Sequence, residues 1–238
     1  MKLRFVGTIA AALLIMFAGY AALFIAPEER TMHEIQRIFY FHLASWITSF
    51  TAFFIAFVAN AAYLATRRAK WDWLGVAGAE VGVACCTIGL ITGPLWARPV
   101  WGIWWTWDAR LTTTFILWLL YISYLLLRGL IEDPQRRATL SAIYGVFAFL
   151  DVPLVYMANR LWRTQHPQPV ILGGSGSGLD PVMSKVLLVC VIASFGVMTL
   201  GFLDRYRLEQ LRHECEELRQ EVESRAIESQ SISKKGQT

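Results

Sequence analysis

Six long apolar segments dominate the chain, and shorter polar stretches separate them. They lie at about residues 5–25, 45–65, 75–94, 111–129, 138–157 and 182–203. A helix needs roughly 20 consecutive apolar residues to cross a bilayer, because lipid offers no hydrogen-bond partner to an unpaired backbone group. The pattern therefore predicts an all-α integral membrane protein with six transmembrane helices.

The composition agrees with a membrane protein. Of the 238 residues, 55% are hydrophobic, 17% are charged and ten are Trp, whereas about a quarter of the residues in soluble domains are charged. The first segment follows Lys2 and Arg4, as a secretion signal would. It is too long for a signal core and ends without a small-residue cleavage site, so we expect a retained helix.

The distribution of Lys and Arg predicts the orientation. Six spans place both termini on one side, and an N-in/C-in arrangement puts more basic residues in the inner segments than in the outer loops. The outer basic residues are all Arg, two in each outer loop: Arg30, Arg37, Arg98, Arg110, Arg160 and Arg163. They either snorkel to the interface or meet a shared anionic ligand on the outer face.

The outer loop between the third and fourth segments is rich in Trp. It contains Trp101, Trp104, Trp105 and Trp107, followed by Asp108 and Arg110. If this stretch is helical, positions 101, 104, 105 and 108 share one face, which would form a shelf for a large planar apolar ligand. The alternatives are interfacial anchoring for the indoles and capping of the fourth helix for Asp108, which does not exclude a role in orienting Arg110.

Two histidines lie in the other outer loops, His42 and His166. A single loop His is commonly a solvated polar residue, but neutral imidazole is also a common axial ligand of haem iron. Together with the Trp-rich loop and the outer Arg residues, the pair predicts a haem site. The chain has no C-x-x-C-H motif for covalent haem and no Walker A motif for ATP hydrolysis.

Residues 101–110, WGIWWTWDAR, resemble the WWD motif of the haem-handling proteins of cytochrome c biogenesis. The six-helix size, with one His loop on either side of the motif, is similar to the haem exporter protein C (CcmC) type over about residues 1–203. The resemblance implies that His42 and His166 are the axial ligands of a non-covalently and transiently bound haem b. It also implies that the motif residues hold haem. Among the outer arginines, Arg37, Arg110 and Arg163 are our candidates for contacts with the propionates.

The resemblance further implies haem delivery without enzymatic activity, at the outer face of the bacterial inner membrane. The expected recipient is a periplasmic haem chaperone of the CcmE type. Other expected partners are ABC transporter ATPase and permease subunits of the CcmA and CcmB types, a small single-helix subunit of the CcmD type, and membrane lipid. No nucleic-acid partner is expected.

Two other functions are compatible with parts of this pattern. A haem-to-apocytochrome c synthase shares the WWD motif, but such proteins are usually larger and have more helices and more His. A b-type electron-transfer cytochrome normally buries its His ligands within facing helices, whereas no His lies in the middle of a predicted span here.

After residue 203 the chain becomes charged, so we divide it into a membrane domain, 1–203, and a cytoplasmic tail, 204–238. In the tail, apolar residues recur at steps of three and four: Leu208, Leu211, Cys215, Leu218 and Val222. They predict an amphipathic extension of the last helix that is too short to indicate a coiled coil. From about Ser229 onward we expect disorder.

Two acids, Glu80 and Asp151, lie inside predicted spans, where carboxylates are costly. At about 1.5 Å per residue, Glu80 is level with Asn60, and we expect a hydrogen bond between them. Asp151 lies in the outer third of its span, close to a kink expected at Pro153. It either supports the haem loops or bonds to a hydroxyl of a neighbouring helix.

Overall fold

The computed structural model of the chain describes residues 2–162, 164–166 and 178–235. The α-helices are α1 (Lys2–Tyr20), α2 (Ile38–Thr66), α3 (Ala69–Trp101), α4 (Ala109–Leu130), α5 (Pro134–Phe149), α6 (Asp151–Leu161) and α7 (Pro181–Lys235). A π-helical turn, η1 (Ala21–Ile25), extends α1, and a 3₁₀ turn, η2 (Glu34–Arg37), precedes α2.

The helices confirm the six predicted spans. Those long and apolar enough to cross a membrane are Arg4–Ile25, Glu34–Thr66, Ala69–Trp101, Ala109–Leu130, Pro134–Leu161 and Pro181–Ala226. The fifth span consists of α5 and α6, which are separated at Leu150. Pro153 explains this break, because a proline inside a helix lacks the N–H and its ring clashes with the carbonyl four residues earlier.

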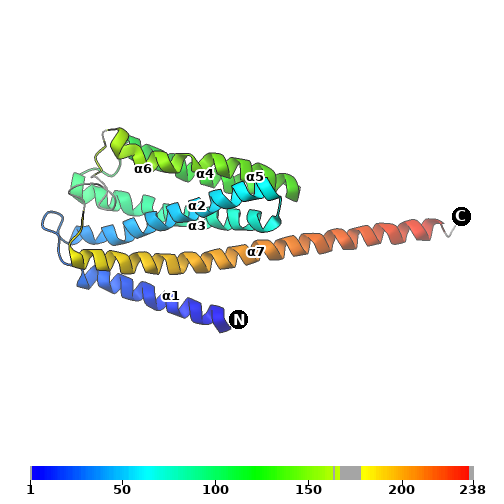
Figure 1. Ribbon diagram of the computed structural model, residues 1–238, viewed down its shortest axis with the longest axis horizontal. Coiled ribbons are helices and arrows are strands. Elements are labelled where there is room, and N and C mark those ends of the chain that lie inside the picture. Colours follow the sequence, from blue (N-terminus) through cyan, green and yellow to red (C-terminus); the bar gives the residue numbers. More distant parts are fainter. Residues whose placement is uncertain (1, 163, 167–177, 236–238) are drawn as a thin grey trace.

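Figure 1 shows α2 and α3 between the group formed by α4, α5 and α6 and the long helix α7, with α1 against α7. The two termini lie at the end opposite the α3–α4 connection. We call the end that carries the η1–η2, α3–α4 and α6–α7 connections the outer end, following the predicted orientation. At the other end, Arg4 of α1 pairs with Asp204 of α7.

Small residues allow α2 and α3 to approach closely. A Cβ added at Gly78 would lie 2.9 Å from the Ala52 carbonyl oxygen, and one at Gly75 would lie 2.8 Å from Asn60 Oδ1. Neither contact leaves room for a side chain. Close backbone approach through small residues is a general means of packing helices in lipid, where the hydrophobic effect does not drive association.

Helix α7 is longer than the sequence analysis predicts. It continues without interruption through residue 203, extends beyond the other helices (Figure 1) and reaches Lys235, although we expected disorder from Ser229. Exposed ion pairs support the extension, since Arg219 contacts Glu223 at 2.8 Å and Arg225 contacts Glu221 at 2.6 Å. Pairs at this four-residue spacing stabilise a helix that has no packing partner.

The predicted hydrogen bond between Glu80 and Asn60 is wrong. Glu80 forms an ion pair with Arg205 of α7, and the nearest polar partner of Asn60 is the Tyr124 hydroxyl, at 3.5 Å. The predicted common depth is wrong as well, because Asn60 lies beside Gly75 of α3, five residues before Glu80. Both the level at which two helices meet and the direction of a side chain depend on how the helices pack.

Asp151 faces the interior, and its side chain lacks the predicted partner. The residue is only 8% exposed, and its Oδ2 atom has no hydrogen-bond partner among the described residues. Neither a contact with the haem loops nor a bond to a neighbouring hydroxyl is found there.

Candidate functional site

The Trp-rich connection is not a helix, so the predicted common face of positions 101, 104, 105 and 108 is wrong. Helix α3 ends at Trp101, and Gly102 adopts a left-handed conformation with a φ of 76°. Glycine is the usual residue at this position because it has no Cβ to clash. Helix α4 then starts anew after Asp108.

The indoles consequently separate into two groups. Trp101 contacts His166, with ring centroids 5.4 Å apart and planes at 74°. Trp105 packs against Trp107 at 5.7 Å, and both rings contact Phe115 of α4. Trp104 is 56% exposed. The connection therefore presents aromatic surfaces in two directions instead of one flat shelf.

An apolar groove of about 380 Å³ lies between α3 and α4 beneath the second group. Its lining consists of Thr87, Leu90, Ile91, Pro94, Trp105, Trp107, Phe115 and Trp118. Neither His42 nor His166 belongs to this lining. The groove is thus separate from the imidazoles, although the same connection borders both.

His42 lies in the second turn of α2, not in a loop as predicted, because the helix begins at Ile38, and it is half-buried against α3. Its Nδ1 atom is 2.9 Å from Thr92 Oγ1 of α3, and its Nε2 atom accepts a hydrogen bond from Trp46 Nε1 at 3.2 Å. The Trp96 ring is 5.8 Å from the imidazole. Sequence reasoning missed Thr92 and Trp46, because no motif connects them with His42.

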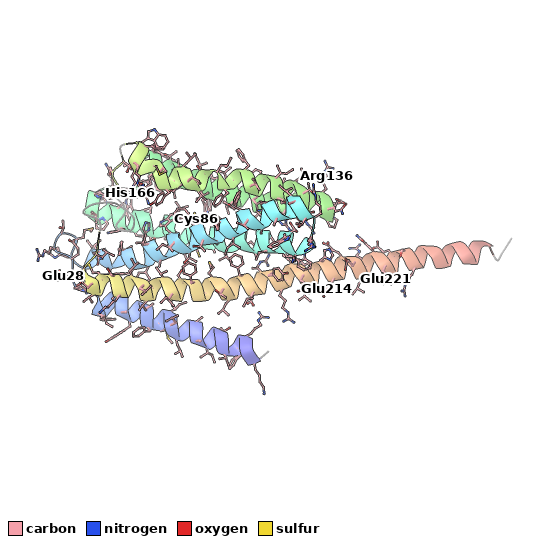
Figure 2. All side chains as sticks on the ribbon, in the orientation of Figure 1. Glu28, Cys86, Arg136, His166, Glu214 and Glu221 are labelled. Atoms are coloured by element: carbon pink, nitrogen blue, oxygen red, sulfur yellow. The ribbon has the colours of Figure 1, made fainter. Side chains whose placement is uncertain are left out.

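His166 is brought to the Trp-rich connection by the α6–α7 segment. Figure 2 places it at the end of the bundle opposite Arg136, which lies in the first turn of α5. Burial lowers the pKa of His166 to about 4, and the positive charge of Arg110 acts in the same direction, against the opposing effect of Asp108. The imidazole is therefore neutral at physiological pH.

Asp108 connects the Trp-rich segment with the segment that carries His166. Its Oδ1 atom accepts a hydrogen bond from the Leu111 backbone N–H at 2.9 Å and caps α4. Its Oδ2 atom accepts from the Gln165 N–H at 3.3 Å. The carboxylate is thus a helix cap, as the sequence allowed, and it also joins two connections, a contact that the sequence did not predict.

The three candidate arginines have different positions. Arg110 lies within electrostatic range of both His42 and His166, and its guanidinium donates to Asn159 Oδ1 at 2.5 Å. Arg37 pairs with Glu34 and also reaches the Ala22 carbonyl, so it serves the connection between α1 and α2. Arg163 lies outside the described residues.

Within the part of the chain that the structure describes, several buried polar atoms at this end lack a hydrogen-bond partner. They include Trp96 Nε1, Trp105 Nε1, Thr112 Oγ1, Thr164 Oγ1 and His166 Nδ1. Buried polar groups are normally hydrogen-bonded. The site therefore contains donors and acceptors that a bound ligand with polar groups can satisfy.

The fold and the site together define a multi-pass α-helical membrane protein with two imidazoles, an arginine and several indoles at one end. The family model described as Heme exporter protein C matches residues 2–221. The chain belongs to this family, which connects it with haem transport and cytochrome c biogenesis.

Three relatives described as Heme exporter protein C show the extent of the similarity. The protein of Bradyrhizobium diazoefficiens is 30% identical over 217 residues, covering 91% of this chain and 82% of the relative. That of Haemophilus influenzae is 28% identical over 193 residues, covering 80% and 77%. That of Escherichia coli strain K12 is 30% identical over 164 residues, covering 68% and 65%.

Proposed function

We propose that this chain binds haem b non-covalently at the outer face of the bacterial inner membrane and delivers it to a periplasmic haem chaperone of the CcmE type. The observation that carries the proposal is the convergence of His42 from α2 and His166 from the α6–α7 segment, with Arg110 in electrostatic range of both. The protein has no catalytic role in this proposal.

The side chains present fit haem. His166 is neutral because of its lowered pKa, so its lone pair is free of a proton at neutral pH. Arg110 supplies positive charge for a propionate, and a guanidinium matches a carboxylate well. Trp101, in contact with His166, offers an aromatic surface to a porphyrin ring.

The exposure of the indoles supports transient binding and transfer. Trp104 is 56% exposed and Trp107 is 73% exposed, and both belong to the connection that also carries Trp101 and Asp108. A ligand on this surface remains within reach of a partner in the periplasm. This accessibility favours delivery over electron transfer by a b-type cytochrome, in which the haem is enclosed between helices.

We further propose that the chain acts in a complex with ATPase and permease subunits of the CcmA and CcmB types and with a small CcmD-type subunit. The family description, a haem exporter, supports this context. An ATPase partner also agrees with a sequence that contains no Walker A motif.

A haem-transfer assay tests the function. The purified protein is titrated with haem, its absorbance spectrum is recorded, and transfer to a CcmE-type chaperone is followed. We expect a bis-imidazole spectrum in the wild type and loss of retained haem in His42→Ala and His166→Ala. His33→Ala is the matched control, because His33 is an outer histidine that contacts Glu28 instead. Unchanged haem content and transfer in the His42→Ala, His166→Ala double variant would refute the proposal.

A further inference from the structure

Both ring nitrogens of His42 have a partner, and each comes from a different helix. Nε2 accepts from the Trp46 indole, one turn further along α2, at 3.2 Å. Nδ1 lies 2.9 Å from the Thr92 hydroxyl on α3. The hydrogen-bonding capacity of these two partners determines where the imidazole proton lies.

The indole nitrogen of Trp46 can only donate, so the Nε2 atom of His42 must present its lone pair. A neutral imidazole has one N–H, which is therefore on Nδ1, and Thr92 Oγ1 accepts it. The Thr92 hydroxyl has one proton of its own, and the Ile88 carbonyl oxygen accepts that proton at 2.8 Å. All donors and acceptors in this chain of contacts are consistent with a single tautomer.

We propose that Thr92 is a positioning residue that holds His42 in the Nδ1–H tautomer with Nε2 directed to iron. We also propose that the Trp46 N–H occupies the Nε2 lone pair while no iron is bound. This inference rests on the proposed function, because it concerns the haem ligand. Metal-binding histidines generally donate their second ring N–H to a fixed acceptor, which sets the tautomer and makes the ligand more basic.

The packing around Trp46 explains how an indole comes to lie beside His42. A Cβ at Gly89 would lie 2.8 Å from Trp46 Nε1, so this glycine provides the space for the indole next to α3. The Trp46 ring also packs against Phe50 at 5.5 Å. The hydrogen bond from Trp46 to His42 Nε2 must break before Nε2 can bind iron. The Trp46–His42 bond therefore opposes haem binding, while the Thr92–His42 bond supports it.

The two residues therefore predict effects of opposite sign. Thr92→Val removes the acceptor and is expected to lower haem affinity about 10- to 100-fold, whereas Thr92→Ser keeps it and should bind as the wild type does. Trp46→Phe retains an aromatic ring without the N–H, and it is expected to raise haem affinity about 2- to 10-fold, the range for one neutral hydrogen bond. A purely structural role would lower affinity in both Thr92→Val and Trp46→Phe.

Two further measurements are independent of haem transfer. The ferric–ferrous potential should become more positive in Thr92→Val, because the imidazole loses the bond that makes it more electron-rich. In the haem-free protein, ¹⁵N NMR of labelled histidine should show His42 protonated at Nδ1. Thr51→Val is the matched control, since the Thr51 hydroxyl donates to the Ile47 carbonyl of its own helix.

The outcomes separate this inference from the proposed function. If His42→Ala retains haem as the wild type does, the ligand assignment fails. If His42→Ala loses haem but Thr92→Val matches Thr92→Ser in affinity and potential, only the positioning role of Thr92 is wrong. A His42 protonated at Nε2 in the haem-free protein, or a lower affinity in a folded Trp46→Phe variant, would overturn the role of Trp46.

Discussion

The Asp108 carboxylate and the His166 imidazole lie side by side without a direct hydrogen bond. Asp108 Oδ2 is 3.9 Å from His166 Nδ1, and the same oxygen accepts from the Gln165 N–H at 3.3 Å. Asp108 therefore positions the backbone next to His166, and the imidazole Nδ1 atom has no hydrogen-bond partner among the described residues. Through this carboxylate, the Trp-rich connection and the second histidine form one unit.

Asp108→Asn separates the two functions of this carboxylate. Asn caps a helix about as well as Asp, so the stability of α4 should be retained. The single amide oxygen cannot serve both the Leu111 and the Gln165 N–H, however, and the segment that carries His166 should loosen. We expect normal expression with weaker haem retention, measured by absorbance after gel filtration. Haem retention equal to that of the wild type would show that Asp108 is only a cap.

His166 should titrate far below an ordinary histidine. Its pKa in the folded, haem-free protein is lowered to about 4, mainly by burial, while an unfolded imidazole takes up its proton near about pH 6.5. As the pH falls below about 6.5, this group therefore lowers the free energy of unfolding, until it is protonated in both states. NMR of labelled histidine checks the value. Titration near about pH 6.5 would contradict the burial seen here.

The two indole groups should respond differently to substitution. Trp101→Ala removes the ring next to His166, so the imidazole becomes more exposed and its pKa should rise towards the ordinary value. Trp107→Ala changes the groove between α3 and α4 and should leave the His166 titration unaltered. The same NMR titration distinguishes the variants, and equal shifts in both would indicate that the two groups act as one surface.

A buried ion pair at the inner end should be important for stability. Arg128 Nη1 lies 2.6 Å from Asp72 Oδ1, Arg128 Nη2 lies 3.7 Å from Glu209, and the Arg128 and Asp72 side chains are 7% and 11% exposed. Arg128→Met leaves two buried carboxylates without this cation, and breaking such a pair typically costs about 3–5 kcal/mol. We expect a clearly lower melting temperature in detergent.

The double variant Arg128→Met, Asp72→Asn provides the comparison for this ion pair. It removes the buried charge of Asp72 together with that of Arg128, so it should be more stable than Arg128→Met alone. Arg219→Met is the control, because Arg219 lies in the exposed extension of α7 and pairs with Glu223 of the same helix. Equal melting temperatures for Arg128→Met and Arg219→Met would contradict the role of the buried pair.

The sequence by itself determined the features that depend on position along the chain. The length of each apolar run predicts six spans. His42, the Trp-rich connection and His166 follow the first, third and fifth spans, so all three lie at the same end of the bundle. The WWD motif identified the family. These properties can be derived from residue order because a bilayer requires a minimum helix length and because each span takes the chain to the opposite side of the membrane.

Only the tertiary structure decided which side chains meet. Gly102 interrupts the Trp-rich segment and separates Trp101 from Trp105, and helix packing directs Glu80 to Arg205 instead of Asn60. The contacts that orient His42 and His166 come from Thr92 and Asp108, which lie on other segments of the chain. Residue order predicts depth along a helix, but the direction in which a side chain points depends on the loop conformations and on the packing of all the helices together.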